Sequence, residues 1–346
     1  MSTTIAINGF GRIGRAFFKL AFDHPDITIV AVNDLGDVDN LAYLLKYDTA
    51  YGRSGFEATV IDGGLLVVHD GIEKEIRLFS EKDPSMLPWR DLDIDIVIES
   101  TGVFDSYEKS KAHLDAGAKR VVISAPVKDN PADAGIEGGT MLMGINHEDL
   151  ATARISSNGS CTTNAAAPLI QILHESIGVE KALLSTVHAY TATQGIVDGP
   201  ARKDFRRGRA AAQNIVPAST GAAIATTQVI TDLEGKFDGV AMRVPVIVGS
   251  IVDITFIASR PTSAEEVNDI LRVAASSDRW ENIFGVTEEE IVSSDIIGNP
   301  YPSLADLSFT RVVDGNLVKV LAWYDNEAGY TNALLLHVLE SGKYVG

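Results

Sequence analysis

The chain has 346 residues, a length that predicts about two domains, and its hydrophobic and charged fractions of 45% and 22% are ordinary for a globular protein. Its formal net charge of −18 argues against nonspecific binding to nucleic acids or anionic membranes, because the phosphates of both would repel it. A single cysteine excludes a disulfide scaffold, and neither a signal peptide nor an apolar run of the ~20 residues needed to span a membrane is visible, so we expect a cytoplasmic protein.

The first residues predict a dinucleotide-binding unit. The apolar run Thr3–Ile7 is typical of a buried parallel strand, and a helical pattern follows over Arg15–Phe22. Between them, Gly9, Gly11 and Gly14 stand where a tight turn, the approach of a pyrophosphate and close helix packing require glycine. The motif alone is weak, because glycine-rich turns without any function can also match it.

An acidic residue after the second predicted strand strengthens this interpretation. Ile27–Val32 is apolar and β-branched, and Asp34 follows it near the position at which a carboxylate binds the adenosine ribose hydroxyls. Because this carboxylate would repel a 2′-phosphate, we predict NAD rather than NADP as the cofactor. The alternative for Asp34 is a solvated turn residue or a helix cap.

The rest of the first half of the chain alternates between strand and helix patterns. Short alternating segments separated by glycine-containing turns predict antiparallel hairpins within residues 56–79. Strands are then expected at Ile94–Glu99 and Arg120–Ser124, with a helix at Ser106–Gly117 between them. This alternation predicts a doubly wound, Rossmann-type NAD-binding domain over residues 1–160.

Beyond residue 160 the predicted strands become longer and fewer helices separate them. A helix over Glu265–Ala275 is preceded by Thr262 and Ser263, which form a capping pattern with its first glutamates. We therefore predict an α+β catalytic domain with a mixed or antiparallel sheet over residues 161–325, so that the whole chain belongs to the α/β class. The strands expected there are Ala182–Ala189, Gly239–Pro245, Ser250–Ser259 and Leu317–Tyr324.

The only cysteine, Cys161, stands among hydroxyl-bearing residues directly before a predicted helix at Ala165–Leu173. Unpaired N–H groups and the dipole at a helix start favour negative charge, so we expect a lowered thiol pKa and a reactive thiolate. His188, on a predicted strand with apolar neighbours, is the best candidate for the base that removes the thiol proton. These residue patterns leave open a buried structural cysteine and a core histidine.

Two motifs carry a resemblance to a known family. Ser-Asn-Gly-Ser-Cys-Thr-Thr-Asn at Ser157–Asn164 and Trp-Tyr-Asp-Asn-Glu-Ala-Gly-Tyr at Trp323–Tyr330 are similar to signatures of the phosphorylating glyceraldehyde-3-phosphate dehydrogenases. The resemblance covers essentially the whole chain, with further motifs in the family's order. The sequence departs from the family pattern at Gly159, Ala165, residues 246–248 and residues 127–145.

The resemblance implies an enzyme that oxidises glyceraldehyde 3-phosphate with NAD and inorganic phosphate to give 1,3-bisphosphoglycerate. Cys161 would be its nucleophile and His188 its base, and a C-terminal helix over residues 326–346 would complete the NAD-binding domain. The implied cofactor-binding residues are Asn8, Gly9, Phe10, Gly11, Arg12, Ile13, Asp34, Lys82, Thr101, Ser124, Asn326 and Tyr330. The implied substrate- and phosphate-binding residues are Ser160, Thr162, Thr191, Arg207, Thr220, Gly221 and Arg243.

The resemblance also implies a homotetramer, in which the basic run from Arg202 to Arg209 lines a neighbouring subunit's cofactor pocket. No metal site is expected. One alternative is erythrose-4-phosphate dehydrogenase, although the segment Ser219-Thr220-Gly221-Ala222-Ala223 favours the three-carbon substrate. A second alternative, from another functional class, is a non-catalytic NAD-binding partner protein.

Overall fold

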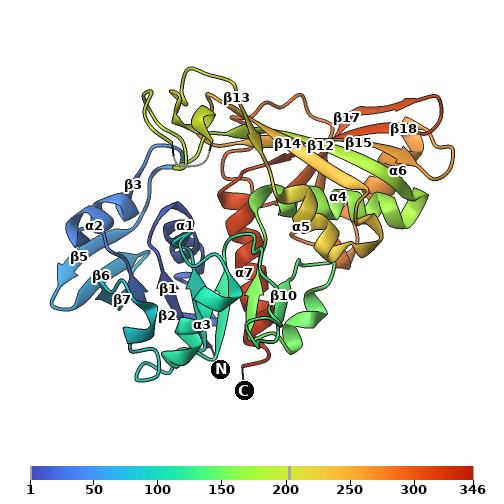
Figure 1. Ribbon diagram of the computed structural model, residues 1–346. Coiled ribbons are helices and arrows are strands. Elements are labelled where there is room, and N and C mark those ends of the chain that lie inside the picture. Colours follow the sequence, from blue (N-terminus) through green and yellow to red (C-terminus); the bar gives the residue numbers. More distant parts are fainter. Residues whose placement is uncertain (1, 202–203, 346) are drawn as a thin grey trace. The chain divides into compact units, whose positions relative to one another are not determined.

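The computed structural model describes residues 2–201 and 204–345, so Arg202 and Lys203 of the predicted basic run lie outside the described residues. The chain forms two compact units (Figure 1): unit 1 contains Met1–Gly159 with Leu334–Gly346, and unit 2 contains Ser160–Ala333. In the described part of the chain, no helix combines the length and the apolar character needed to cross a bilayer.

One large sheet forms the centre of unit 1. Its strands are β1 (Thr3–Asn8), β2 (Ile27–Asn33), β5 (Glu57–Ile61), β6 (Gly64–His69), β7 (Ile72–Phe79), β8 (Ile96–Glu99), β9 (Arg120–Ile123), β10 (Gly138–Thr140) and β11 (Ile155–Ser157). They lie in the order β10-β11-β9-β8-β1-β2-β7-β6-β5. All neighbours from β10 to β7 are parallel, which confirms the predicted doubly wound sheet.

The predicted hairpins are strands β5, β6 and β7, and they are continuous with the main sheet. They pair with one another in antiparallel fashion, whereas β7 pairs with β2 in parallel. Strand β1 lies between β2 and β8, so the chain leaves β1 in one direction and returns on its other side. The carboxyl ends of β1, β2 and β8 at this switch point carry Asn8, Asn33 and Glu99, and an open sheet of this type binds its ligands there.

Helices bury both faces of this sheet in unit 1. The aromatic face of the first helix, with Phe17 and Phe18, packs in one buried cluster with Ile5 of β1. The end of the C-terminal helix contributes Leu334 and Val338 to the same cluster, which is why the last residues belong to unit 1 although the preceding ones belong to unit 2. The helices are α1 (Arg12–Ala21), α2 (Val38–Lys46), α3 (Tyr107–Asp115) and α7 (Ala328–Gly342), and β3 (Tyr47–Asp48) and β4 (Gly52–Arg53) form a small ribbon.

Unit 2 is built on a seven-stranded mixed sheet, as the longer strand patterns predicted. Its strands are β12 (Val179–Ala189), β13 (Val216–Ser219), β14 (Phe237–Val244), β15 (Ser250–Ala258), β16 (Phe284–Thr287), β17 (Ser303–Val313) and β18 (Leu317–Tyr324). They lie in the order β13-β14-β12-β15-β18-β17-β16, with β12–β14 and β16–β17 parallel and the other pairs antiparallel.

One face of this sheet is covered and the other is half-exposed. Side chains of β15 are buried at every second position, because α4 (Cys161–Ile177) and α6 (Ala264–Ala275) pack on one side. Ser263 caps α6 by accepting the Glu266 N–H, as the capping pattern predicted. Leu183 and Val240, on the opposite face, are 67% and 53% exposed. The third helix of the unit is α5 (Ala222–Val229).

Candidate active site

The cysteine lies at the first residue of helix α4. Ser160 is the N-cap, and its Oγ accepts the Thr163 N–H at 3.0 Å. The preceding Gly159 has φ of 64°, a left-handed conformation that favours glycine, so this departure from the family pattern suits the turn into the helix. The half-buried Cys161 therefore presents its sulfur beside the first N–H groups of the helix.

The structure brings Cys161 and His188 together within unit 2. His188 lies near the end of β12, only 2% exposed, and its Nε2 is 3.3 Å from Cys161 Sγ. The ring of Tyr324 packs edge-on against the imidazole, with 5.9 Å between the ring centroids. Strand β12 and helix α4 are thus the two elements that hold the predicted nucleophile and the predicted base at proton-transfer distance.

The Nδ1 atom of His188 lies between the Arg243 guanidinium and a backbone carbonyl oxygen. Arg243 Nη1 lies 2.6 Å from His188 Nδ1 and 3.1 Å from the Ala189 carbonyl oxygen. Because a guanidinium can only donate, this contact requires Nδ1 to accept, whereas the Ala189 carbonyl oxygen, 2.7 Å from Nδ1, can only accept and requires Nδ1 to donate. With the proton on Nδ1, the lone pair of Nε2 faces Cys161 and can accept the thiol proton; when Arg243 donates to Nδ1, the proton of the neutral ring lies on Nε2 instead.

The expected lowering of the thiol pKa is wrong for this resting site. Burial raises the pKa of the Cys161 thiol, and the opposing charge of Arg243 and the hydrogen bonds with Thr162 do not overcome it. Burial also lowers the His188 pKa to about 3, helped by the positive charge of Arg243. The pair therefore rests as a neutral thiol and a neutral imidazole, and the thiolate must form by proton transfer during the reaction.

Two of the predicted anion-binding residues, Arg207 and Arg243, lie around the imidazole. The positive charges of both help to lower the His188 pKa. Arg207 Nη1 donates to Thr193 Oγ1 at 3.0 Å, and that oxygen lies 2.9 Å from Thr191 Oγ1. Two guanidiniums and a pair of hydroxyl groups form a suitable surface for phosphate oxygens beside Cys161 and His188.

The other predicted substrate residues lie at the starts of helices α4 and α5. Thr162 is 4% exposed, and its Oγ1 is 2.9 Å from the buried hydroxyl of Tyr324. Thr220 and Gly221 lie at the start of α5, which packs against α4, and Thr220 Oγ1 accepts the Ala222 N–H. Gly221 caps α5 without a side-chain bond, so the helix start offers N–H groups to an anion.

Sequence reasoning missed the hydroxyl cluster under the cysteine. Tyr324 OH lies 2.9 Å from Thr162 Oγ1 and 2.8 Å from Thr186 Oγ1, so it ties the start of α4 to β12. Burial raises the Tyr324 pKa, which keeps the phenol neutral. Its aromatic character within the Trp323–Tyr330 motif was visible, but no sequence pattern indicates which hydroxyl groups it contacts.

Asn326 and Tyr330 lie in unit 2 at the start of the last helical segment. Asn326 is 6% exposed, and its Oδ1 accepts hydrogen bonds from Gly249 N–H at 3.1 Å and Ser250 Oγ at 3.0 Å. These two donors fix the orientation of the amide, so that its Nδ2 is the end suited to donate to a carboxamide oxygen. Tyr330 is 4% exposed in α7.

The glycine turn of unit 1 fits a dinucleotide. A Cβ at Gly14 would lie 2.1 Å from the Gly9 carbonyl oxygen, and one at Gly9, whose φ is 96°, would lie 2.6 Å from Thr101 N. A Cβ at Gly11 would meet nothing within 4 Å, so this position is open to an approaching ligand. Gly9 and Gly14 thus shape the turn, whereas Gly11 leaves room for the pyrophosphate.

The remaining predicted cofactor residues surround this turn. Asp34 Oδ2 accepts the Phe10 N–H at 2.6 Å, so the carboxylate also fixes the turn. Arg12 pairs with Asp48 at 2.6 Å, and Ile13 packs against the buried core cluster. Lys82 and Thr101 are exposed, while Ser124 donates its backbone N–H to the Glu99 carbonyl oxygen at 2.9 Å. The Asn8 side chain is 1% exposed, and both its Oδ1 and its Nδ2 are engaged in internal hydrogen bonds, so this side chain does not reach a cofactor.

Alanine at two of these glycines should separate folding from cofactor binding. Gly14→Ala forces a backbone clash and is expected to lower the free energy of unfolding by about 1–3 kcal/mol. Gly11→Ala should leave stability unchanged but weaken NAD binding by roughly tenfold or more, because its methyl group occupies the open approach. Urea unfolding and calorimetric titration with NAD measure the two effects; unchanged NAD affinity in Gly11→Ala would contradict this assignment of the turn.

Buried histidines predict a loss of stability in acid. Burial lowers the pKa of His337 to about 4 and that of His188 to about 3, against about 6.5 in an unfolded chain. Their contribution to the free energy of unfolding is fully present above pH 6.5. It is lost as the pH falls toward 3, because the unfolded state binds more protons than the folded state in that window. Between pH 7 and pH 5 we expect a loss of roughly 2 kcal/mol per histidine. Urea unfolding of His337→Gln should show a shallower decline, and an identical pH dependence would contradict this origin.

Two models of known protein families match this chain, one within each unit. Residues 3–107 match the family model described as glyceraldehyde 3-phosphate dehydrogenase, NAD binding domain, and residues 160–326 match the model for the C-terminal domain of the same family. Glyceraldehyde-3-phosphate dehydrogenases of Clostridium pasteurianum and Streptomyces coelicolor are 46% and 47% identical to this chain over 338 residues. The alignments cover 96% of both chains for the first and 97% of both for the second. The chain therefore belongs to the glyceraldehyde-3-phosphate dehydrogenase family and is an NAD-dependent dehydrogenase.

Proposed function

We propose that this enzyme converts glyceraldehyde 3-phosphate, NAD and inorganic phosphate to 1,3-bisphosphoglycerate, a step of glycolysis and gluconeogenesis. The distance of 3.3 Å between Cys161 Sγ and His188 Nε2, beside two arginines, is the observation that carries the proposal. A thiol next to a base suits covalent attack on an aldehyde, and the arginines suit the phosphate groups of both substrates.

The proposed chemistry begins with proton transfer from Cys161 to His188 as the sulfur attacks the aldehyde carbon to form a thiohemiacetal. Bound NAD supplies the acceptor for the hydride that leaves this carbon. The imidazolium of His188 first returns the thiol proton to the oxyanion, which gives the hydroxyl group, and the neutral ring takes that proton back as the carbonyl re-forms and a thioester is left on Cys161. Inorganic phosphate then attacks the thioester, and backbone N–H groups of Ser160 and Cys161 at the helix start stabilise the oxyanion. The C–S bond breaks as this oxyanion collapses, which releases the acyl phosphate and leaves the Cys161 thiolate to take the proton from His188.

Substrate phosphate has a specific proposed effect on the base. When a phosphate engages Arg243, the guanidinium leaves His188 Nδ1, and the neutral ring keeps its single proton on Nδ1, which donates to the Ala189 carbonyl oxygen 2.7 Å away. The lone pair of Nε2 then faces Cys161 and can accept its proton. Arg207, Thr191, Thr220, Gly221, Thr162 and Ser160 are proposed to complete the binding of the two anions.

A phosphate-dependent NADH assay tests the proposal most directly. NADH formation should require both glyceraldehyde 3-phosphate and inorganic phosphate, and erythrose 4-phosphate should be the poorer aldehyde. Equal or better turnover of erythrose 4-phosphate without phosphate would replace the proposed substrate. If the protein binds NAD but turns over neither aldehyde, the proposal is wrong and the protein is a non-catalytic NAD-binding protein.

We also propose that the enzyme is a homotetramer of the cytoplasm, where Cys161 remains a reduced thiol. The half-exposed face of the unit 2 sheet supports self-association, since Leu183 and Val240 place apolar side chains on adjacent strands. Leu183→Lys should shift the sedimentation coefficient toward smaller species, whereas Val273→Lys, at a 72% exposed position on α6, should not. An unchanged assembly in Leu183→Lys would remove this face from the interface.

A further inference from the structure

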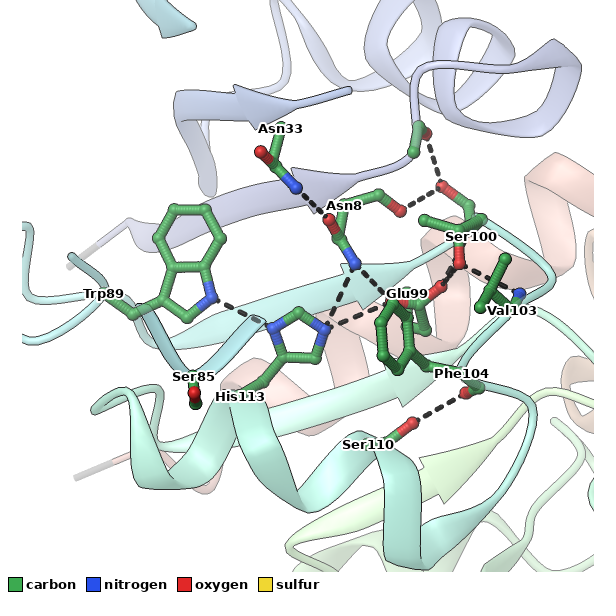
Figure 2. Close-up of polar contacts among 12 residues, drawn as sticks. Asn8, Asn33, Ser85, Trp89, Glu99, Ser100, Val103, Phe104, Ser110 and His113 are labelled. Atoms are coloured by element: carbon green, nitrogen blue, oxygen red, sulfur yellow. Dashed lines mark hydrogen bonds and ion pairs between the residues drawn. The ribbon is translucent and has the colours of Figure 1, made fainter. Parts of the chain in front are cut away.

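Buried polar side chains form a hydrogen-bonded chain at the carboxyl ends of β1, β2 and β8 in unit 1 (Figure 2). Its centre is Glu99, the last residue of β8, which is 2% exposed. One carboxylate oxygen accepts Asn8 Nδ2 at 2.5 Å and lies 3.1 Å from His113 Nε2. The other accepts the Thr101 N–H at 2.8 Å and also the Thr101 hydroxyl. Four donors from three elements therefore meet at one buried carboxylate.

The direction of every hydrogen bond on the histidine side of this chain is fixed by an indole. Trp89 Nε1–H can only donate, and it lies 3.0 Å from His113 Nδ1. His113 Nδ1 must therefore accept, which places the proton of the neutral ring on Nε2, pointing at Glu99. The histidine has no acceptor left to offer, so the group at position 99 has to accept from it.

A backbone group fixes the direction on the other side in the same way. The Glu81 N–H donates to Asn33 Oδ1 at 2.8 Å, so Asn33 Nδ2 is the end that donates to Asn8 Oδ1 at 2.7 Å. Asn8 Nδ2 is then the end directed at Glu99. Asn8 Nδ2 and His113 Nε2 lie 3.3 Å from each other, and the Glu99 oxygen is the acceptor that both share. A flip of the Asn8 amide would place its oxygen against the Glu99 carboxylate, and a His113 proton on Nδ1 would face the Trp89 N–H.

The members of this chain adjoin the proposed cofactor contacts. Asn8 precedes Gly9, Asn33 precedes Asp34, and Glu81 precedes Lys82. Glu99 is bonded directly to Thr101, and Ser100 Oγ donates to the Gly9 carbonyl oxygen at 2.7 Å. The turns that follow β1, β2, β7 and β8 are thus held in mutual register by one set of buried side chains.

From this arrangement we infer that Glu99 is a positioning residue for NAD: it acts as the common acceptor that holds the cofactor-binding turns, without touching the cofactor itself. The inference rests on the proposed cofactor residues, but not on the identity of the aldehyde. An amide at position 99 keeps the shape of the side chain and still accepts from Thr101, but its NH₂ group faces the donors of Asn8 and His113. These repulsive contacts then displace the turns that bind the cofactor.

The test compares Glu99→Gln with Asp95→Asn, the same carboxylate-to-amide change just before the opposite end of the same strand. Asp95 accepts the Thr4 N–H at 2.8 Å and pairs with Lys119, so its loss also affects stability but at the amino edge of the sheet. Calorimetric titration with NAD should show about ten- to hundredfold weaker binding for Glu99→Gln. The affinity of Asp95→Asn should stay within twofold of the wild type, and kcat of Glu99→Gln at saturating NAD should be close to the wild-type value while KM for NAD rises.

A second variant covers the case in which Glu99→Gln does not fold, which thermal unfolding of the NAD-free protein reveals. Asn33→Ala removes the far branch, with less change of buried charge, and should weaken NAD binding about fivefold or more. Wild-type NAD affinity in folded Glu99→Gln, or in Asn33→Ala if the former does not fold, would overturn the inference, as would an equal loss in Asp95→Asn. Because NAD binding is measured without aldehyde or phosphate, these outcomes are separate from failure of the proposed reaction.

Discussion

The Cys161→Ser enzyme is expected to lose kcat/KM for glyceraldehyde 3-phosphate by a factor on the order of 10⁴ or more, because the replacement removes the covalent nucleophile. A serine hydroxyl is a far weaker acid than a thiol. The imidazole of His188 therefore leaves it protonated, and a neutral hydroxyl group is a poor nucleophile. The measurement is the initial rate of NADH formation with aldehyde, NAD and phosphate all present.

The fold should tolerate this substitution. The sulfur lies 3.3 Å from His188 Nε2 and 4.0 Å from Thr162 Oγ1, and a hydroxyl group can replace it in both contacts. NAD affinity and the midpoint of thermal unfolding should therefore match the wild type and serve as the controls. Turnover near the wild-type rate would remove Cys161 from the nucleophile role.

The strands were predictable where burial makes the sequence uniform. β1, β2, β8 and β9 are apolar runs because both sheet faces of unit 1 are covered, and their patterns predicted the doubly wound sheet. β17 was missed, since Asp306, Ser308 and Arg311 interrupt its pattern. The structure accommodates Asp306 by a hydrogen bond from Trp323 Nε1 at 3.0 Å and an irregular register before Arg311, neither of which has a local signal.

The site shows a similar limit. Motif resemblance predicted Cys161 as nucleophile and His188 as base, and these residues are 27 positions apart in sequence with Sγ and Nε2 3.3 Å apart. The thiol pKa was predicted in the wrong direction, because the helix start is a local feature whereas desolvation depends on the strands and the tyrosine that enclose the sulfur. The Glu99 network was also invisible, since its members come from six separate segments of the chain.

His188→Asn should produce the second large effect, a fall in kcat/KM of about 10²- to 10⁴-fold. Asparagine can still form a hydrogen bond toward Cys161, but it cannot take the thiol proton or the hydroxyl proton. Cys161 would then depend on solvent to form its thiolate, and burial has raised the pKa of that thiol. The residual rate should therefore increase with pH, by up to about tenfold per unit below the thiol pKa.

His174→Asn is the matched control for this variant. His174 lies near the far end of helix α4, where its Nδ1 accepts the Val179 N–H at 3.1 Å, and it has no contact with the sulfur. Its rate and pH profile should stay within about twofold of the wild type, whereas a loss comparable to that of His188→Asn would point to a general disturbance of unit 2. If His188 is the base, its loss makes the reaction depend on ionisation of the thiol by solvent, so the rate must rise with pH. A His188→Asn rate that is low but independent of pH would therefore assign the proton transfer to another group and would leave Cys161 as the nucleophile.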